Sequence, residues 1–184
     1  MDNDCPGYLK YMKVIEKVCI KAVFIMKMKT GVEQSVYAIL ILNMLPDKAV
    51  LPGEAISQQL GASSTYFQKL LRKLVNADLI ISVPGVKGGF RLNKKPEDIR
   101  VYDIYLAIEG QQSLYSSRGV LNDMLELEYG DRCCLLAGLM EEAESSWKSV
   151  LKRETIASLY EKIKDDFKPK VQSLEEWIKE NMVL

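Results

Sequence analysis

The sequence predicts a mostly α-helical fold, namely a winged helix-turn-helix with a small β-hairpin wing, followed by a long dimerisation helix. Three observations support this prediction. Apolar residues recur at helical spacing on both sides of a tight turn, a glycine-rich turn then separates two short apolar runs, and an apolar heptad pattern extends over residues 134–153.

The helix-turn-helix is expected early in the chain. Apolar residues at helical spacing indicate a first helix over residues 32–45, which Pro46 ends. A short second helix fits residues 53–60, and Gly61 then opens a tight turn. A third helix begins at one of the two serines that follow, since either hydroxyl can cap it, and runs to about Asn76.

The third helix has one apolar side and one polar, basic side, as a recognition helix does. Its buried side is predicted to consist of Phe67, Leu70, Leu71 and Leu74. The opposite side carries Thr65, Gln68, Lys69, Arg72 and Asn76. Such a surface suits a polyanion.

The residues after this helix predict a β-hairpin. Residues 79–83 are apolar and largely β-branched, a proline- and glycine-rich turn follows, and residues 90–92 resume an alternating strand. The glycines would let the turn approach a phosphate or a groove closely, while the basic residues supply charge. The alternative is a hairpin that only covers the core. The wing residues expected to contact a nucleic acid are Lys87, Gly88, Gly89 and Arg91.

Composition excludes several classes of function. The chain has no histidine among its 184 residues, so it lacks the general base of most hydrolases and a common zinc ligand. No phosphate loop or cofactor motif occurs, and we expect neither enzyme activity nor a metal. Four cysteines without a CxxC pair, and an acidic, polar N-terminus, favour a reducing cytoplasm. No stretch is long and apolar enough for a membrane helix.

The formal net charge of zero conceals an uneven distribution. Residues 26–95 hold 10 Lys and Arg against 4 Asp and Glu, whereas residues 96–184 hold 11 against 18. A basic block beside an acidic block indicates two modules with different tasks. We therefore predict an N-terminal extension over residues 1–25 without an assigned role, a winged-helix DNA-binding domain over 26–95, and a helical dimerisation and regulatory region over 96–184.

A long helix is predicted over residues 134–153, after an irregular segment over residues 111–131. Two heptads are too short for an independent coiled coil, so the seam packs either against its copy in a homodimer or against its own domain. We favour the homodimer, because two-fold symmetry is common among DNA readers of this architecture. Thr155 can cap the next helix, and a final helix is expected to clasp the body. The seam consists of Leu136, Met140, Ala143, Trp147 and Val150.

Cys133 and Cys134 are candidate redox residues at the start of the long helix. Their Cα atoms lie about 3.8 Å apart across a trans peptide, too close for an unstrained internal disulfide, so a bridge to another subunit is favoured. The helix dipole and Arg132 lower the pKa of a thiol here, whereas Asp131 opposes that shift. In the alternative interpretation, both cysteines are small apolar residues buried at the head of the helix.

Four motifs occur in a specific order along residues 26 to about 160. They are MKMKTGVEQSVYAILIL, STYFQKLLRKLVNADLI, VPGVKGGFRL followed by PEDIRVYDIYLAIEG, and CLLAGLMEEAESSWKSVLKRETIASL. In these motifs the chain resembles the Rrf-two family of bacterial winged-helix transcriptional regulators, which includes iron-sulfur and cysteine-metabolism repressors. The resemblance implies a homodimer whose long helices pair and whose wings flank a palindromic operator.

The resemblance also implies an iron-sulfur cluster, held by three cysteines in the segment that matches residues 111–134. The chain departs from this pattern. Only Cys134 stands where the last of those cysteines would be, Cys133 is an extra neighbour, and residues 111–132 contain no cysteine. Because a cluster needs thiolates or imidazoles at several corners, we expect no cluster and no other cofactor.

Together, these observations predict a homodimeric, sequence-specific DNA-binding transcriptional regulator, a repressor that responds to thiol oxidation. The alternative is a winged-helix module that docks a regulatory partner protein without binding DNA; the exposed cations favour DNA. Gln68 is suited to reading adenine and Arg72 to reading guanine, and the lysines are suited to phosphates. The predicted DNA contacts are Ser63, Ser64, Thr65, Tyr66, Gln68, Lys69, Arg72, Lys73, Lys87, Gly88, Gly89 and Arg91.

Overall fold

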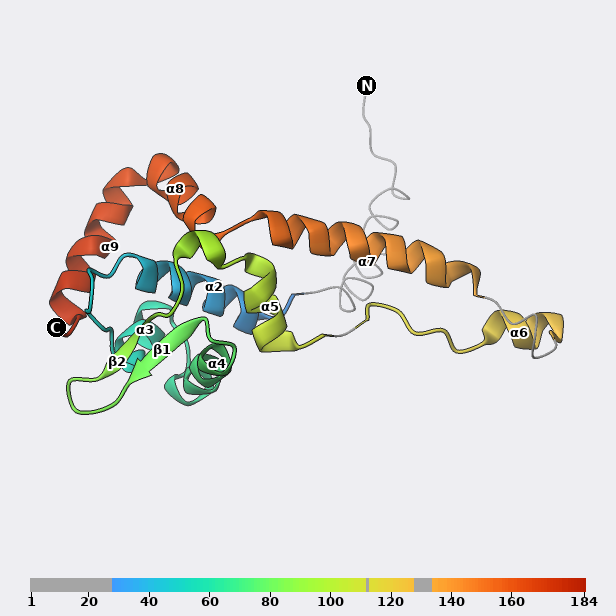
Figure 1. Cartoon of the computed structure of the whole chain (residues 1–184), viewed down its shortest axis with the longest axis horizontal. Helices are drawn as coiled ribbons and strands as arrows, with labels where there is room; N and C mark the ends of the chain where they lie inside the picture. The colour runs from blue at the N-terminus through green and yellow to red at the C-terminus, as the bar shows by residue number, and fades with distance from the viewer. Residues whose placement is uncertain (1–27, 112, 128–133) are drawn as a thin grey trace, which may run out of the picture.

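The computed structural model describes residues 28–111, 113–127 and 134–184. The predictions for residues 1–25 and for Cys133 lie outside the described residues. Figure 1 shows a helical body with a small hairpin on one side and a helical arm that extends away from it. Within the described ranges, no helix combines the length and the apolar character needed to cross a membrane. The elements in chain order are α2 (Thr30–Asn43), α3 (Gly53–Gln59), α4 (Ser64–Asn76), β1 (Ile80–Val83), β2 (Gly89–Leu92), the short 3-10 helix η1 (Pro96–Asp98), α5 (Val101–Glu109), α6 (Val120–Leu125), α7 (Leu135–Arg153), α8 (Ile156–Asp166) and α9 (Lys168–Asn181).

The helix-turn-helix forms where the apolar spacing predicts it. After α3, Gly61 adopts a left-handed φ of +60°, and the Ala62 N–H donates to the Ser57 carbonyl over 2.8 Å. α4 begins at Ser64, and Ser63 occupies the N-cap position without a side-chain capping hydrogen bond. The turn geometry, rather than a hydroxyl cap, therefore sets the start of α4.

The wing is an antiparallel hairpin tied to the segment before α3. In its register, Val83 pairs with Gly89. The Phe90 N–H donates to the Leu51 carbonyl over 2.9 Å, and the Leu51 N–H donates to the Phe90 carbonyl over 3.0 Å. A Cβ on Gly89 would lie 2.6 Å from the Leu51 oxygen, so only glycine fits beside this backbone.

One hydrophobic core holds α4 against the rest of the body. Phe67, Leu71 and Leu74 of α4 are fully buried, and they belong to the same cluster as Ile104 of α5 and Ile156 of α8. This core includes residues from both sides of the predicted boundary at residues 95 and 96. The two predicted regions therefore share one core, and the boundary between them is proposed on functional grounds only. The predicted fold class, a mostly α-helical winged helix-turn-helix with a long helix, is confirmed.

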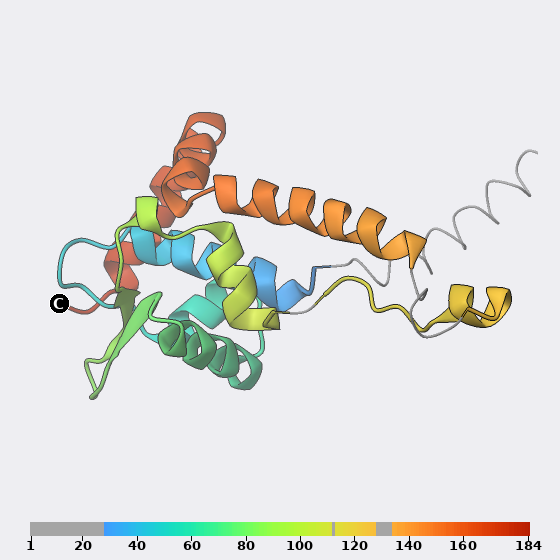
Figure 2. The ribbon, with the colours of Figure 1, turned by 45° about the vertical axis from the view of Figure 1, so that its right-hand side comes forward.

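The long helix α7 extends from the body as an arm, and residues 113–119, here called the strap, run beside it toward α6 (Figures 1 and 2). The carboxylate of Glu144 on α7 accepts hydrogen bonds from the Leu114 N–H over 3.0 Å and from the Ser113 hydroxyl over 3.2 Å. These two bonds attach the start of the strap to the middle of the arm.

The structure corrects the prediction that residues 111–131 are irregular. Val120–Leu125 form the short helix α6, which begins after Gly119 (φ +76°) and ends at Glu126 (φ +50°), both in the left-handed region. Six residues make less than two helical turns, which is too short for a recognisable apolar period. The sequence pattern therefore could not reveal this helix.

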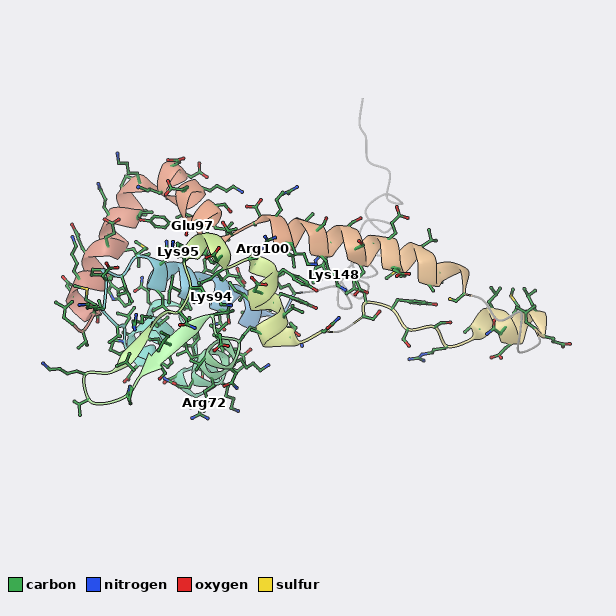
Figure 3. The ribbon with its side chains drawn as sticks, viewed as in Figure 1. Arg72, Lys94, Lys95, Glu97, Arg100 and Lys148 are labelled. Carbon is green, nitrogen blue, oxygen red and sulfur yellow. The ribbon has the colours of Figure 1, made fainter. Side chains whose placement is uncertain are left out.

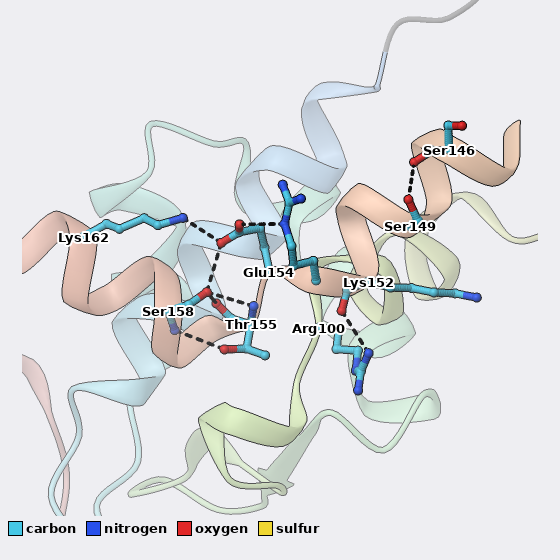
Figure 4. Close-up of polar contacts among 9 residues, drawn as sticks. Arg100, Ser146, Ser149, Lys152, Glu154, Thr155, Ser158 and Lys162 are labelled. Atoms are coloured by element: carbon cyan, nitrogen blue, oxygen red, sulfur yellow. Dashed lines mark hydrogen bonds and ion pairs between the residues drawn. The ribbon is translucent and has the colours of Figure 1, made fainter. Parts of the chain in front are cut away.

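The base of the arm is pinned to the body at the junction between α7 and α8 (Figure 4). A guanidinium N–H of Arg100 donates to the Lys152 carbonyl over 3.0 Å. The Ile156 N–H donates to the Ile99 carbonyl over 2.9 Å. The segment before α5 thus bonds to chain on both sides of the junction, and α7 leaves the body in a defined direction.

Side chains reinforce the same junction. Thr155 caps α8 by accepting from the Ser158 N–H over 3.1 Å, which confirms the predicted cap. Glu154 accepts from Lys162 over 2.8 Å and from the Ser158 hydroxyl over 3.1 Å. Lys162 first, and then Ser158, hold the pKa of Glu154 below its ordinary value.

The final helix α9 clasps the body, as the sequence predicts. Its chain end is fixed by a β-bridge in which Val50 and Val183 exchange two N–H to carbonyl hydrogen bonds of 2.9 Å. The apolar residues that α9 places in or against the core are Val171, Leu174, Trp177 and Ile178.

The contact between Gly89 and Leu51 predicts that Gly89→Ala destabilises the fold by about 1–3 kcal/mol, because the added methyl group forces backbone apart. Urea unfolding of the full chain measures the change. Gly138→Ala is the matched control: nothing lies within 4 Å of its Cβ position on α7, so alanine should be neutral or stabilising there. A Gly89→Ala variant as stable as the original chain would contradict the structural role.

Candidate nucleic-acid interface

The outer side of α4 and the wing lie on one edge of the body, opposite the arm (Figures 1 and 2). Arg72 projects from α4 away from the body (Figure 3). Within the described residues, neither Lys69 nor Arg72 forms an ion pair, so both charges are available to a negatively charged partner. The exposed residues of this edge are Ser63, Ser64, Thr65, Tyr66, Lys69, Arg72, Lys73 and Lys87.

Lys73 has an internal partner that the sequence did not reveal. Its ammonium donates to the Ile108 carbonyl over 2.5 Å, at the last turn of α5, where helix carbonyls lack intrahelical partners. An ammonium has three donors, so the remaining N–H groups of this exposed side chain stay available to a phosphate. Lys73 therefore links the predicted recognition helix to the element that leads into the strap.

Two further α4 side chains lie against the body rather than pointing straight outward. A Cβ on Gly31 would lie 2.5 Å from the Tyr66 hydroxyl, so that hydroxyl rests on the start of α2. A Cβ on Gly53 would lie 2.7 Å from the Gln68 amide nitrogen, and Gln68 is half-buried beside the start of α3. Gln68 must turn outward before its amide can bond a base edge.

In the wing, the predicted contact residues occupy different depths. Lys87 is exposed at the tip, whereas Gly88 is half-buried and Gly89 is buried under Leu51. Arg91 is half-buried on β2, opposite Ile81, at the base of the hairpin and not at its tip. The tip lysine is therefore the most accessible of the four.

Cys134 forms a separate polar group at the N-cap of α7. Its Sγ lies 3.3 Å from the Tyr115 hydroxyl of the strap. Hydrogen bonds from Ser117 first, and then from Tyr115, lower the pKa of the Cys134 thiol, and backbone groups at the start of α7 lower it further. The sequence predicted the effect of the helix start, but the two strap hydroxyls were missed because only the fold brings them to the thiol.

The donor set does not fit the iron-sulfur cluster that the family resemblance implies. The strap offers hydroxyl groups to Cys134, and residues 111–132 supply neither cysteine nor histidine. In the parts of the chain that the structure describes, no three cysteine, aspartate or glutamate side chains converge as a metal site would require. Cys134 is the one cysteine in the part of the chain that the structure describes, and a single thiolate cannot hold such a cluster.

The predicted seam of α7 divides into two sides. Leu136 is 55% exposed, Val150 is 48% exposed, and Ala143 lies between them on the exposed side. Trp147 instead packs edge-to-face on Tyr105 of α5, with ring centroids 4.7 Å apart.

Met140 belongs to the covered side, where it lines a cavity of about 580 Å³ beside the strap. Leu139, which is 63% exposed and was missed by the heptad pattern, joins the exposed row. Because an α-helix has 3.6 residues per turn, residues at heptad spacing drift around its surface. Part of the predicted seam, Met140 and Trp147, therefore packs against other parts of the same chain.

The fold and this basic edge define a winged helix-turn-helix protein of the nucleic-acid-binding type. A family model, Rrf2, described as "Iron-dependent Transcriptional regulator", matches residues 28–162. The chain therefore belongs to the Rrf2 (Rrf-two) family of transcriptional regulators, as its motifs indicate, and not to a family of enzymes.

The chain matches each of three known proteins over at least 75% of that protein's length. YwgB of Bacillus subtilis (strain 168), by name a candidate HTH-type transcriptional regulator, is 39% identical over 153 residues, which is 83% of this chain and 95% of YwgB. The HTH-type transcriptional regulator IscR of Vibrio atlanticus (strain LGP32) is 29% identical over 134 residues, 73% of this chain and 75% of IscR. The structure of CymR (YrzC), the global cysteine regulator of B. subtilis, superposes with a TM-score of 0.57 at 26% identity, covering 73% of this chain and 96% of CymR.

The hydrogen bonds to Cys134 predict how fast this thiol is alkylated. In a variant whose other cysteines are serine, Ser117→Ala should raise the pKa of Cys134, leave less thiolate at pH 7, and slow iodoacetamide alkylation roughly 3- to 10-fold. Mass spectrometry follows the modified fraction. Ser145→Ala, at an exposed α7 position outside this hydrogen-bonded group, is the control and should leave the rate unchanged. Equal rates in all three proteins would contradict the assigned cause.

Proposed function

We propose that the chain is a homodimeric, sequence-specific DNA-binding regulator that represses transcription from a palindromic operator. The supporting observation is the basic edge formed by α4 and the wing, where Lys69 and Arg72 are exposed and free of ion pairs within the described residues. In this proposal α4 lies in the major groove and the wing tip contacts the flanking backbone. Winged helices that dock proteins have no need for this charge.

Arg72 is proposed as the main base-reading residue. It projects outward from the middle of α4 (Figure 3), and a guanidinium can bond both acceptors of a guanine edge. Gln68 is a second reader that must leave its place beside Gly53 to reach an adenine. Lys69, Lys73 and Lys87 are proposed to contact phosphates, which set affinity and register and carry no sequence information.

Homodimerisation is proposed through the exposed row of α7. Isolated apolar side chains are common on surfaces, but several exposed apolar side chains on one side of a projecting helix make a candidate interface. Pairing of two such rows would bury apolar area and place the two α4 helices in a symmetric arrangement, as a palindromic site requires. The residues of the row are Leu136, Leu139, Ala143 and Val150.

A thiol response is proposed at Cys134. Its lowered pKa favours the nucleophilic thiolate, and a disulfide to the other subunit needs two thiols and one peroxide, which yield one disulfide and two waters. The strap joins Cys134 to α5, whose last turn accepts a hydrogen bond from Lys73 of α4. Oxidation at the arm can thereby reach the DNA-reading helix.

The DNA proposal predicts a steep salt dependence. Affinity for an operator duplex should fall on the order of a thousandfold between about 50 and 200 mM salt. Arg72→Ala should weaken binding by about 1–3 kcal/mol and relax discrimination at one base pair, whereas Lys69→Ala should weaken all duplexes alike. Fluorescence anisotropy measures each. Lys179→Ala, which removes an exposed cation on α9, is the control and should have little effect. Flat salt dependence would refute electrostatic DNA binding.

The dimer proposal predicts that Ala143→Asp yields monomers, because each dimer would bury two unpaired carboxylates at a total cost of several kcal/mol. Sedimentation measures the oligomeric state, and DNA affinity should fall with it. Ser145→Asp adds the same charge at another exposed α7 position and should remain dimeric. If Ala143→Asp stays dimeric, the interface lies elsewhere.

A further inference from the structure

A cavity of about 280 Å³ lies away from the basic edge, where α8 and α9 fold back over α2 and the end of α3. Figures 1 and 2 show α8 and α9 as a hooked pair of helices on this side of the body. Four helices therefore contribute walls. The lining residues are Leu40, Ile41 and Met44 from α2, Leu60 after α3, Ile163 from α8, and Val171 and Leu174 from α9, together with Tyr37, Gln59 and Tyr160.

The cavity is apolar inside and has a few polar groups toward solvent. Leu40, Ile41 and Val171 are buried, whereas Tyr37 is 46% exposed and Gln59 is exposed. No charged side chain is among the lining residues. An apolar space with a small number of hydrogen-bonding groups is the usual form of a small-molecule site.

Water does not fill such a space well. An ordered buried water needs two to four polar partners, which an aliphatic floor does not provide, and apolar cavities instead take up apolar molecules such as benzene. A ligand seated on this floor would gain van der Waals contacts with several aliphatic side chains at once. The size is just below the usual range of ligand pockets, which starts at about 300 Å³.

The site is built partly from chain that the family model does not cover. That model ends at residue 162, and Ile163, Val171 and Leu174 come after it. The helix α9 that carries two of these residues is held by the bridge between Val50 and Val183, just before α3. The cavity is thus walled on one side by residues that lie beyond the match to the family model.

We propose that this cavity binds a small uncharged molecule, aliphatic or aromatic, of roughly ten non-hydrogen atoms. One hydroxyl, carbonyl or similar group of this ligand bonds Tyr37 or Gln59 at the mouth, and the rest of the molecule contacts the aliphatic floor. Carboxylates and amines of the same shape are disfavoured, because no charged side chain lines the cavity, and the charges beside Tyr160 in its wall, Lys164 and Glu175, are of opposite sign.

The position of the cavity suggests that its ligand regulates DNA binding. This regulatory role rests on the proposed DNA-binding function. Gln59 and Leu60 directly precede the turn at Gly61 that sets the start of α4. A ligand that contacts both α9 and the residues before this turn stabilises the relative position of α9 and the turn that it fits better. Because the turn sets the start of α4, this shift changes the affinity for DNA. Ligand binding itself does not depend on that function.

Benzyl alcohol, benzoate and benzylamine form a matched set of probes, with one ring and three different charges. The full chain carries ¹³C-methyl methionine, and the Met44→Leu variant assigns the Met44 methyl signal in the cavity wall. Benzyl alcohol should shift this signal saturably, and both charged analogues should bind at least about tenfold more weakly. Absence of a saturable shift, or equal effects of all three probes, would overturn the proposal.

Cavity-filling variants locate the binding. Leu174→Phe should fold with the original circular dichroism and lose the benzyl alcohol response; if it does not fold, Ile163→Phe provides the same test. Leu125→Phe is the matched control, since Leu125 is 54% exposed on α6 and does not line this cavity, and it should keep the response. A response that persists in the filled variant would overturn the assignment to this cavity.

A DNA-binding measurement separates this proposal from the proposed function. Benzyl alcohol should change the affinity of the original chain for its operator and leave Leu174→Phe unaffected. DNA binding without any probe-induced methyl shift would remove the cavity site and retain the regulator. A probe-induced shift in a chain that binds no DNA would retain the site and remove the proposed regulator.

Discussion

The burial of one side of α4 is the constraint on which the rest of the structure depends. Phe67, Leu71 and Leu74 are completely buried against α2, α3 and α5, and complete burial of three large side chains allows one rotation of the helix only. That rotation turns Lys69 and Arg72 to solvent on the edge shared with the wing. The charge pattern of this surface follows from apolar packing on the opposite side of the helix.

The same core explains how distant parts of the chain are connected. α5 packs on α4, and its ends carry two different links: Arg100 bonds the Lys152 carbonyl at the base of the arm, and Ile108 accepts a hydrogen bond from Lys73. The strap follows α5 in the chain after three intervening residues, and it contacts Cys134 at the far end of the arm. A single short helix thus stands between the arm, the strap and the predicted recognition helix.

The sequence predicted the elements whose signals are local. Periodic apolar residues revealed α2, α4 and α7, and the glycine-rich turn revealed the wing. It could not predict contacts made by tertiary packing, such as the place of Gln68 beside Gly53 or that of Trp147 on Tyr105. Gly89 shows the same limit: the turn predicts a glycine, but only the fold shows that the Leu51 backbone requires it.

Selection of binding sites from random DNA duplexes tests the central claim most directly. If two copies of the chain present their α4 helices symmetrically, the selected duplexes converge on a palindrome whose half-sites lie about one helical turn, roughly 34–36 Å, or a multiple of it apart. The selected sequence should then contain, in each half-site, a guanine that Arg72 contacts. Selection that enriches no sequence would contradict the account and favour a winged helix that docks a partner protein.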